Sequence, residues 1–202
     1  MEIIFTNFKY QRTLIPLDVE KVDMIFIHHT ASRTATPEQI QEWHKKFGGF
    51  GYNEYVRKDG RVYIGRGDHI GAHTYNHNSR SYGICLEGNY DIEPPPPVYL
   101  LQILAERVLE AQRRFPKAET PLPHFARFAT NCPGRNFPMD RLYDVISDIK
   151  KKNGRITDID EALQILLERG VINTPLYWKN SLRYYNYVEE LILNFANYTN
   201  KK

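Results

Sequence analysis

Two side chains that bind soft transition metals lie close together in one short stretch of the sequence. His124 and Cys132 are eight residues apart, and Thr130 lies between them. A thiolate and an imidazole on one irregular loop suit a zinc ion. Because two ligands do not hold a catalytic zinc ion, we expect a third ligand from a distant part of the chain.

A pair of histidines far upstream offers that ligand. His28 and His29 end an apolar segment that begins at residue 24. One of them, together with His124 and Cys132, would make a three-ligand site with one position open for water, which is typical of a hydrolytic zinc site. Neighbouring side chains on a strand point to opposite faces, so only one of the pair can face the metal. The segment is apolar on both faces, so its pattern leaves the choice open.

Two more polar side chains could assist the hydrolysis of an amide. Tyr52 begins a predicted strand, and its phenol could donate to the oxyanion of a tetrahedral intermediate, although tyrosine is also common in strands for packing. Thr130 could be a second polar group at the reacting carbonyl, or its hydroxyl could bond to the local backbone. The residues alone leave both alternatives open.

The elements that must position these side chains alternate between strands and helices. The pattern predicts strands over 22–29, 52–57, 61–64 and 82–86, and helices over 37–47, 100–115 and 139–151. Such alternation predicts an α/β fold in which helices pack on a mostly buried sheet.

The composition allows one medium domain and a small appendage. Of the 202 residues, 42% are apolar and 25% are charged, and the formal net charge is +3. A charge this small does not indicate nucleic acid as a partner, although a mild basic excess favours anionic partners. No segment has the roughly 20 apolar residues of a membrane span.

The chain has two cysteines, Cys85 and Cys132. A disulfide between them is one possibility. We favour a thiolate ligand at Cys132 and a small buried side chain at Cys85, because Cys85 lies in a predicted strand.

Several motifs recur in an order that resembles a known superfamily. They are Ile27-His28-His29-Thr30-Ala31, Ile40-Gln41-Glu42-Trp43-His44, Gly51-Tyr52-Asn53 with Asp59-Gly60, Gly71-Ala72-His73, Asn76-His77-Asn78-Ser79, Gly83-Ile84-Cys85-Leu86-Glu87-Gly88, and His124 with Thr130 and Cys132-Pro133. Over roughly residues 20–150 the chain resembles the zinc amidases of the peptidoglycan-recognition-protein superfamily. The resemblance implies a central mixed β-sheet flanked by helices, and cleavage of the amide between the lactyl group of N-acetylmuramic acid and L-alanine in peptidoglycan.

The resemblance also implies roles for individual residues. It assigns zinc to His28, His124 and Cys132, and thereby selects the first histidine of the pair. It makes Tyr52 the catalytic tyrosine and places Thr130 where active relatives have Thr or Lys. His73 and Asn78 match positions in the substrate groove. His29 would then face away and hydrogen-bond within the sheet.

Two positions depart from the pattern of this superfamily. Cys85 stands where some amidase branches carry a catalytic Glu, so we expect the tyrosine-type arrangement here. Glu87 lies two residues further on and shares a strand face with Cys85, from where it could partly compensate. Pro123 precedes His124 where a glycine is usual, so we expect different surroundings for the metal ligands.

The resemblance favours an endolysin or autolysin, and two other function classes stay open. The first residues lack a basic region and a long apolar run, so we expect a protein made in the cytoplasm without a signal peptide that acts on the cell wall after release. Some members of the superfamily bind peptidoglycan without cleaving it, typically after losing the Cys ligand, and Cys132 favours cleavage. A related phage amidase fold also inhibits a polymerase, and the motifs do not report on that activity.

The last fifty residues form a predicted appendage. We assign the catalytic domain to residues 1–152 and a helical segment to 156–202, with a linker at 150–154 and helices over 157–170 and 182–198. Because a helical pair this small buries little surface, we expect it to dock on the first domain or to self-associate. Its aromatic residues could instead stack on sugar rings of the wall. They are Tyr177, Trp178, Tyr184, Tyr185, Tyr187, Phe195 and Tyr198.

Overall fold

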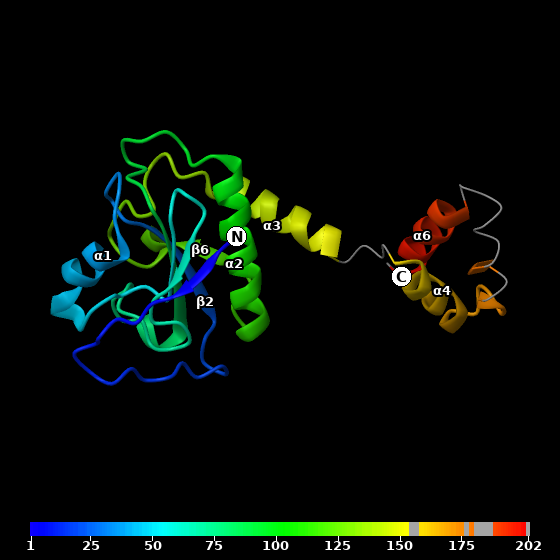
Figure 1. Ribbon diagram of the computed structural model, residues 1–202, viewed down its shortest axis with the longest axis horizontal. Coiled ribbons are helices and arrows are strands. Elements are labelled where there is room, and N and C mark those ends of the chain that lie inside the picture. The colour runs from blue at the N-terminus through cyan, green and yellow to red at the C-terminus, as the bar shows by residue number, and fades with distance from the viewer. Residues whose placement is uncertain (154–157, 176–177, 180–187, 201–202) are drawn as a thin grey trace. The chain divides into compact units, whose positions relative to one another are not determined.

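The computed structural model describes residues 1–153, 158–175, 178–179 and 188–200 (Figure 1). The chain divides into two compact units, Met1–Ser147 and Asp148–Lys202. This boundary falls inside helix α3 (Met139–Asn153), whereas the sequence pattern placed it a few residues later.

The first unit is built on a six-stranded mixed sheet. Its strands are β1 (Ile3–Phe5), β2 (Met24–His29), β3 (Glu54–Val56), β4 (Val62–Ile64), β5 (Ser81–Leu86) and β6 (Pro121–Pro123). They lie in the order β1-β4-β3-β5-β2-β6, and the β3–β4 hairpin is antiparallel while the other pairs are parallel. Every residue of β2 and β5 is buried, as expected for central parallel strands covered on both faces. The predicted mixed α/β fold is confirmed.

The two edge strands, β1 and β6, are absent from the sequence-based prediction. Each has only three residues, and β6 is Pro-Leu-Pro, a composition that sheets tolerate only at an edge. The position of β6 matters for the site, because it pairs in parallel with β2 and aligns Ile27 with Pro123. The next residues of the two strands are His28 and His124, so the register brings these two histidines together.

Helices α1 (Pro37–Trp43) and α2 (Val98–Arg114) lie on opposite sides of the sheet (Figure 1). Helix α1 begins at Thr36, which forms a capping box with Gln39, and the following turn η1 (Lys45–Phe47) ends at a left-handed Gly48. The apolar face of α2 packs on β3 and β5. Both helices start and end within a few residues of the predicted positions.

A buried ion pair fixes α2 to the sheet. Glu54 of β3 is fully buried, and Arg107 donates to it from Nε at 2.6 Å and from Nη2 at 2.8 Å. Arg114 and the hydroxyl of Tyr82 also donate to Glu54, at 3.2 and 2.7 Å. The carboxylate is therefore paired and fully hydrogen-bonded, which is the condition for tolerating a buried charge.

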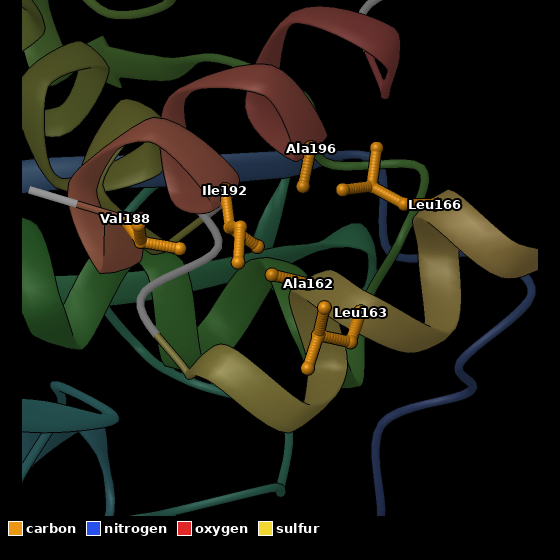
Figure 2. Packing of buried hydrophobic residues seen from close by; sticks show 6 residues of the cluster. All are labelled: Ala162, Leu163, Leu166, Val188, Ile192 and Ala196. Carbon is orange, nitrogen blue, oxygen red and sulfur yellow. The ribbon is translucent and has the colours of Figure 1, made fainter. Parts of the chain in front are cut away.

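The second unit contains α4 (Ile159–Glu168) and α6 (Val188–Thr199). Figure 2 shows the cluster of buried side chains that joins them, which consists of Ala162, Leu163, Leu166, Val188, Ile192 and Ala196. Helix α4 starts at the predicted place, because the Asp158 side chain accepts from the backbone of the first turn. Residues 182–187, predicted as the start of the last helix, lie outside the described residues.

The structure corrects the predicted linker at 150–154. Helix α3 continues through Asn153, and its last turn carries Lys150, Lys151 and Lys152. Positive side chains at this end interact favourably with the helix dipole, which explains why the lysine run is helical. Residue 154 lies outside the described residues.

Some aromatic side chains of the appendage are packed in its core and others are exposed. Trp178 packs against the α4–α6 cluster, whereas Phe195 and Tyr198 are exposed and stack on each other. Tyr177, Tyr184, Tyr185 and Tyr187 lie outside the described residues. Across the part of the chain that the structure describes, no helix has the length and apolar character to cross a membrane.

Candidate metal centre

Three segments converge at the carboxyl ends of β2 and β6. His28 is the next-to-last residue of β2, and His124 follows β6 directly as the first residue of the turn η3 (His124–Ala126). The rings of these histidines have their centroids 4.5 Å apart. The loop after η3 folds back on itself, since Phe125 N donates to the carbonyl of Cys132 at 3.0 Å. This bond holds Cys132 close to the two histidines.

The donor atoms of these three residues have the spacing of a metal site. One ligand atom from each of His28, His124 and Cys132 lies within 4.8 Å of the others. The Nδ1 atom of His28 is 3.6 Å from Cys132 Sγ. Zinc bonds of about 2.0 Å to nitrogen and 2.3 Å to sulfur at a tetrahedral angle separate those two atoms by about 3.5 Å, close to the distance in the protein. The residues present therefore fit a zinc ion.

A second observation supports this fit. His124 Nε2 is buried and has no hydrogen-bond partner. Buried polar nitrogen atoms almost always have a hydrogen-bond partner, so a buried nitrogen without one indicates a partner other than protein atoms. A metal ion accepting the Nε2 lone pair is such a partner.

Burial sets the protonation of the three candidate ligands. It lowers the pKa of His28 well below 6.5, with the neighbouring histidines adding to the effect, and it lowers the pKa of His124 to about 4. Both rings are therefore neutral near pH 7, which is the form that binds metals. Burial raises the pKa of the Cys132 thiol to about 12, although the His29 amide donates to its sulfur at 3.4 Å. A cation must therefore displace the thiol proton on binding.

One pocket of about 410 Å³ gathers every side chain that the sequence analysis singled out for this site. They are His28, Tyr52, His73, Asn78, His124, Thr130 and Cys132. The aromatic residues Phe47, Tyr75 and Phe128, all exposed, also line it. Sequence positions more than one hundred residues apart thus share a single concave surface.

The phenol of Tyr52 lies against the first candidate ligand. Its ring centroid is 5.3 Å from that of His28 and 5.1 Å from that of His44. Burial raises the pKa of Tyr52 well above 10, and the neighbouring Cys85 contributes. The phenol therefore keeps its proton and can act as a hydrogen-bond donor in the pocket.

Thr130 shows one of its two alternative interactions. Its Oγ1 accepts from Cys132 N at 3.2 Å, which is the local hydroxyl-to-backbone bond. This bond uses only the acceptor capacity of the oxygen, so the hydroxyl proton can still be donated into the pocket. Its assistance in catalysis stays a prediction.

The two predicted substrate contacts are partly used within the protein. Asn78 Oδ1 accepts from the amides of His73 and Thr74, at 2.8 and 3.0 Å. His73 is 9% exposed, and its Nδ1 is 3.1 Å from His28 Nε2. Substrate binding by His73 and Asn78 stays a prediction.

Two neighbours of the site have structural partners. His29 lies outside the candidate ligand set, and its Nδ1 accepts from the Tyr90 amide at 3.1 Å, so its partner lies in the loop after β5 rather than in the sheet. Glu87 accepts from the amides of Ala35 and Lys58, each at 2.8 Å. These bonds occupy both carboxylate oxygens, so Glu87 does not compensate for Cys85 at the site. Both cysteines are free.

The sequence analysis gave His44 no role, and the structure brings it into the pocket. Its Nδ1 accepts from the Gly51 amide at 2.9 Å, and its ring contacts Tyr52. Burial, assisted by the charge of Arg66, lowers the pKa of His44 to about 4. The sequence signals were a histidine at the end of an amphipathic helix and its place in the recurring motif Ile40-Gln41-Glu42-Trp43-His44, and neither reveals a contact with a loop residue.

Comparison with known proteins agrees with this geometry. A family profile described as N-acetylmuramoyl-L-alanine amidase matches residues 18–135. The chain is 32% identical over 139 residues to the human N-acetylmuramoyl-L-alanine amidase, an alignment that covers 60% of this chain and 23% of the human protein. It is 35% identical over 83 residues to the endolysin of Klebsiella phage KP32, which covers 38% of this chain and 55% of that protein. The chain thus spans about a quarter of the length of the human relative.

A solved structure shares the fold. The endolysin amidase LysCS from Clostridium intestinale superposes with a TM-score of 0.66 at 29% identity, covering 72% of this chain and 95% of that one. The profile match includes β2, the hairpin, β5 and the loop from His124 to Cys132, and so contains all three candidate ligands. On the strength of a profile match over more than half its length, the chain belongs to the N-acetylmuramoyl-L-alanine amidase family.

Proposed function

We propose that this protein is a zinc-dependent peptidoglycan amidase, acting as an endolysin or autolysin. The bond cleaved is the amide between the lactyl group of N-acetylmuramic acid and L-alanine. The observation that carries this proposal is the convergence of His28, His124 and Cys132 on one pocket with their donor atoms within 4.8 Å of one another. Three protein ligands leave a fourth position for the reacting oxygen, as hydrolytic zinc sites do.

The chain supplies the candidate ligands in neutral form, with His28 buried and His124 and Cys132 half-buried. His28 would bind through Nδ1, His124 through Nε2 and Cys132 through its sulfur. When bound, a zinc ion supplies a Lewis acid that polarises a carbonyl and lowers the pKa of a water molecule towards neutrality. His28 is 1% exposed, and all three candidate ligands line the pocket, from which a substrate would approach.

Two side chains of the pocket would act on the substrate directly. The phenol of Tyr52 remains protonated and donates a hydrogen bond to the carbonyl oxygen as negative charge develops on it. The hydroxyl of Thr130 is held beside Cys132 by its bond to the Cys132 amide, from where it can donate to the same oxygen. Non-catalytic binding of peptidoglycan is the competing function, and the intact ligand set favours cleavage.

The test is chelation and metal restoration on purified cell walls. Treatment with a chelator should abolish the release of new L-alanine amino termini, and added zinc should restore it. Binding to the walls without new amino termini under either condition would leave only a recognition function. The appearance of new reducing ends instead would identify a glycosidase and refute the assignment.

A further inference from the structure

We propose that His73 is a positioning residue, which holds the imidazole of His28 so that Nδ1 faces the metal site. This inference rests on the zinc site of the proposed function and concerns a residue that is not itself a candidate ligand. His73 contributes no donor atom to the cluster of His28, His124 and Cys132.

The two nitrogen atoms of the His28 ring face different partners. Its Nδ1 is 3.6 Å from Cys132 Sγ, and its Nε2 is 3.1 Å from His73 Nδ1. A ring nitrogen that binds a metal carries no proton, so the proton of neutral His28 must reside on Nε2. Nε2–H then donates to His73 Nδ1, and this bond fixes both the tautomer and the orientation of the ligand.

The His73 ring lies in a space that two glycines leave open. A Cβ atom added to Gly83 would lie 2.5 Å from His73 Cγ, and one added to Gly71 would lie 2.3 Å from Cδ2. Real Cβ atoms do not approach other atoms so closely, so two glycines from separate segments leave room for this ring. The His73 amide is also held, because it donates to Asn78 Oδ1 at 2.8 Å.

The His73 ring also makes polar contacts that a packing residue would not need. Its Nε2 is buried, and the backbone of Ser81 hydrogen-bonds to the imidazole. An apolar ring would fill the same space without these bonds, so the contact of Nδ1 with His28 accounts for a histidine at this position. Thr74 Oγ1 is also 3.1 Å from Nδ1, and its rotating hydroxyl fits either protonation of the ring.

The experiment compares two substitutions of similar shape in the full-length protein. His73→Asn keeps an acceptor near the position of Nδ1, whereas His73→Leu has the same branching without one. Zinc affinity is measured by competition with a chromophoric chelator, without reference to activity. We expect His73→Leu to weaken zinc binding about 10- to 100-fold, the usual effect of removing such a partner, and His73→Asn to restore most of it.

His77→Leu is the matched control. The His77 ring also packs on Phe26, with centroids 6.1 Å apart, as His73 does at 6.3 Å. His77 does not line the pocket, so its substitution should leave zinc affinity unchanged. Equal losses in His73→Leu and His73→Asn would show that the ring only packs, and this would overturn the proposal. A change in KM alone with normal zinc affinity would make His73 a substrate contact and also overturn it.

A measurement on the wild-type protein covers the case in which His73→Leu fails to fold. Long-range ¹H–¹⁵N spectra of the zinc-loaded protein should show His28 protonated at Nε2 and His73 unprotonated at Nδ1. The opposite tautomer of either ring contradicts the proposal. If the wild-type protein binds no zinc, the proposed function fails; if it binds zinc as tightly as His73→Leu does, only the positioning role fails.

Discussion

Cys85 of β5 is the register partner of His28 of β2. Partners on neighbouring strands project to the same face of a sheet, so the second cysteine lies on the face that carries the candidate ligand. It is nevertheless fully buried, and its sulfur contacts the carbonyl of Leu86 at 3.8 Å. Cys85 therefore lies beneath the metal centre and outside its ligand set.

This arrangement predicts opposite results for the two cysteines. Cys132→Ala should remove zinc and activity together, because two histidines alone do not retain the ion. Cys85→Ser should leave the zinc content at wild-type stoichiometry. Metal analysis of both purified variants decides the matter, and an equal drop in zinc content would place Cys85 among the ligands.

Replacing Tyr52 by Phe should reduce kcat without loss of zinc. Removal of one oxyanion donor typically lowers the rate on the order of 10²–10³-fold. Binding of a muropeptide in the ground state should hardly change, because the lost hydrogen bond forms in the transition state. Tyr63→Phe on β4, outside the pocket, is the control for losing a phenol. Normal turnover in Tyr52→Phe would leave the ring with a packing role.

Stability should fall with pH below neutrality in part because of His44. Its pKa is about 4 in the folded protein and about 6.5 in the unfolded chain, so the unfolded chain binds the extra proton between these values. The contribution is fully present above pH 6.5 and is lost as the pH falls towards 4, on the order of 3 kcal/mol over the whole range.

His44→Asn isolates this contribution. The asparagine Oδ1 can accept from the Gly51 amide as His44 Nδ1 does, and it does not titrate. Urea unfolding at pH 7 and pH 5 should show a smaller loss of stability in the variant than in the wild-type protein. Identical losses would mean that the His44 ring accommodates a proton in the folded state.

The buried ion pair on α2 predicts a large effect on stability. Glu54→Gln leaves the guanidinium groups of Arg107 and Arg114 without their buried counter-charge, which costs about 3–5 kcal/mol. Glu20→Gln breaks the exposed pair with Lys117 and should change stability by less than about 1 kcal/mol. The midpoints of urea unfolding measure both, and similar small shifts would contradict the role of Glu54.

The parts of the fold that the sequence predicts are those with a strong local signal. The buried strand ending at His29, the hairpin and the capped helix after Thr36 each follow from periodicity or from turn and cap residues. Periodicity left the choice between His28 and His29 open, and only the family resemblance selected His28, because the register depends on β6, a three-residue Pro-Leu-Pro strand. The contact of His73 with His28 depends in the same way on a loop that only the tertiary structure places.

The three candidate ligands are anchored very differently, which matters for how fast the metal exchanges. His28 belongs to a strand paired on both sides, so its amide neighbours should resist hydrogen exchange up to global unfolding. Cys132 lies on an irregular loop, which a backbone hydrogen bond between Phe125 and Cys132 closes. Transient opening of that loop would detach the Cys132 sulfur from the metal while both imidazoles keep their positions. The residence time of the ion is then set by the kinetics of a surface loop rather than by the lifetime of the folded sheet.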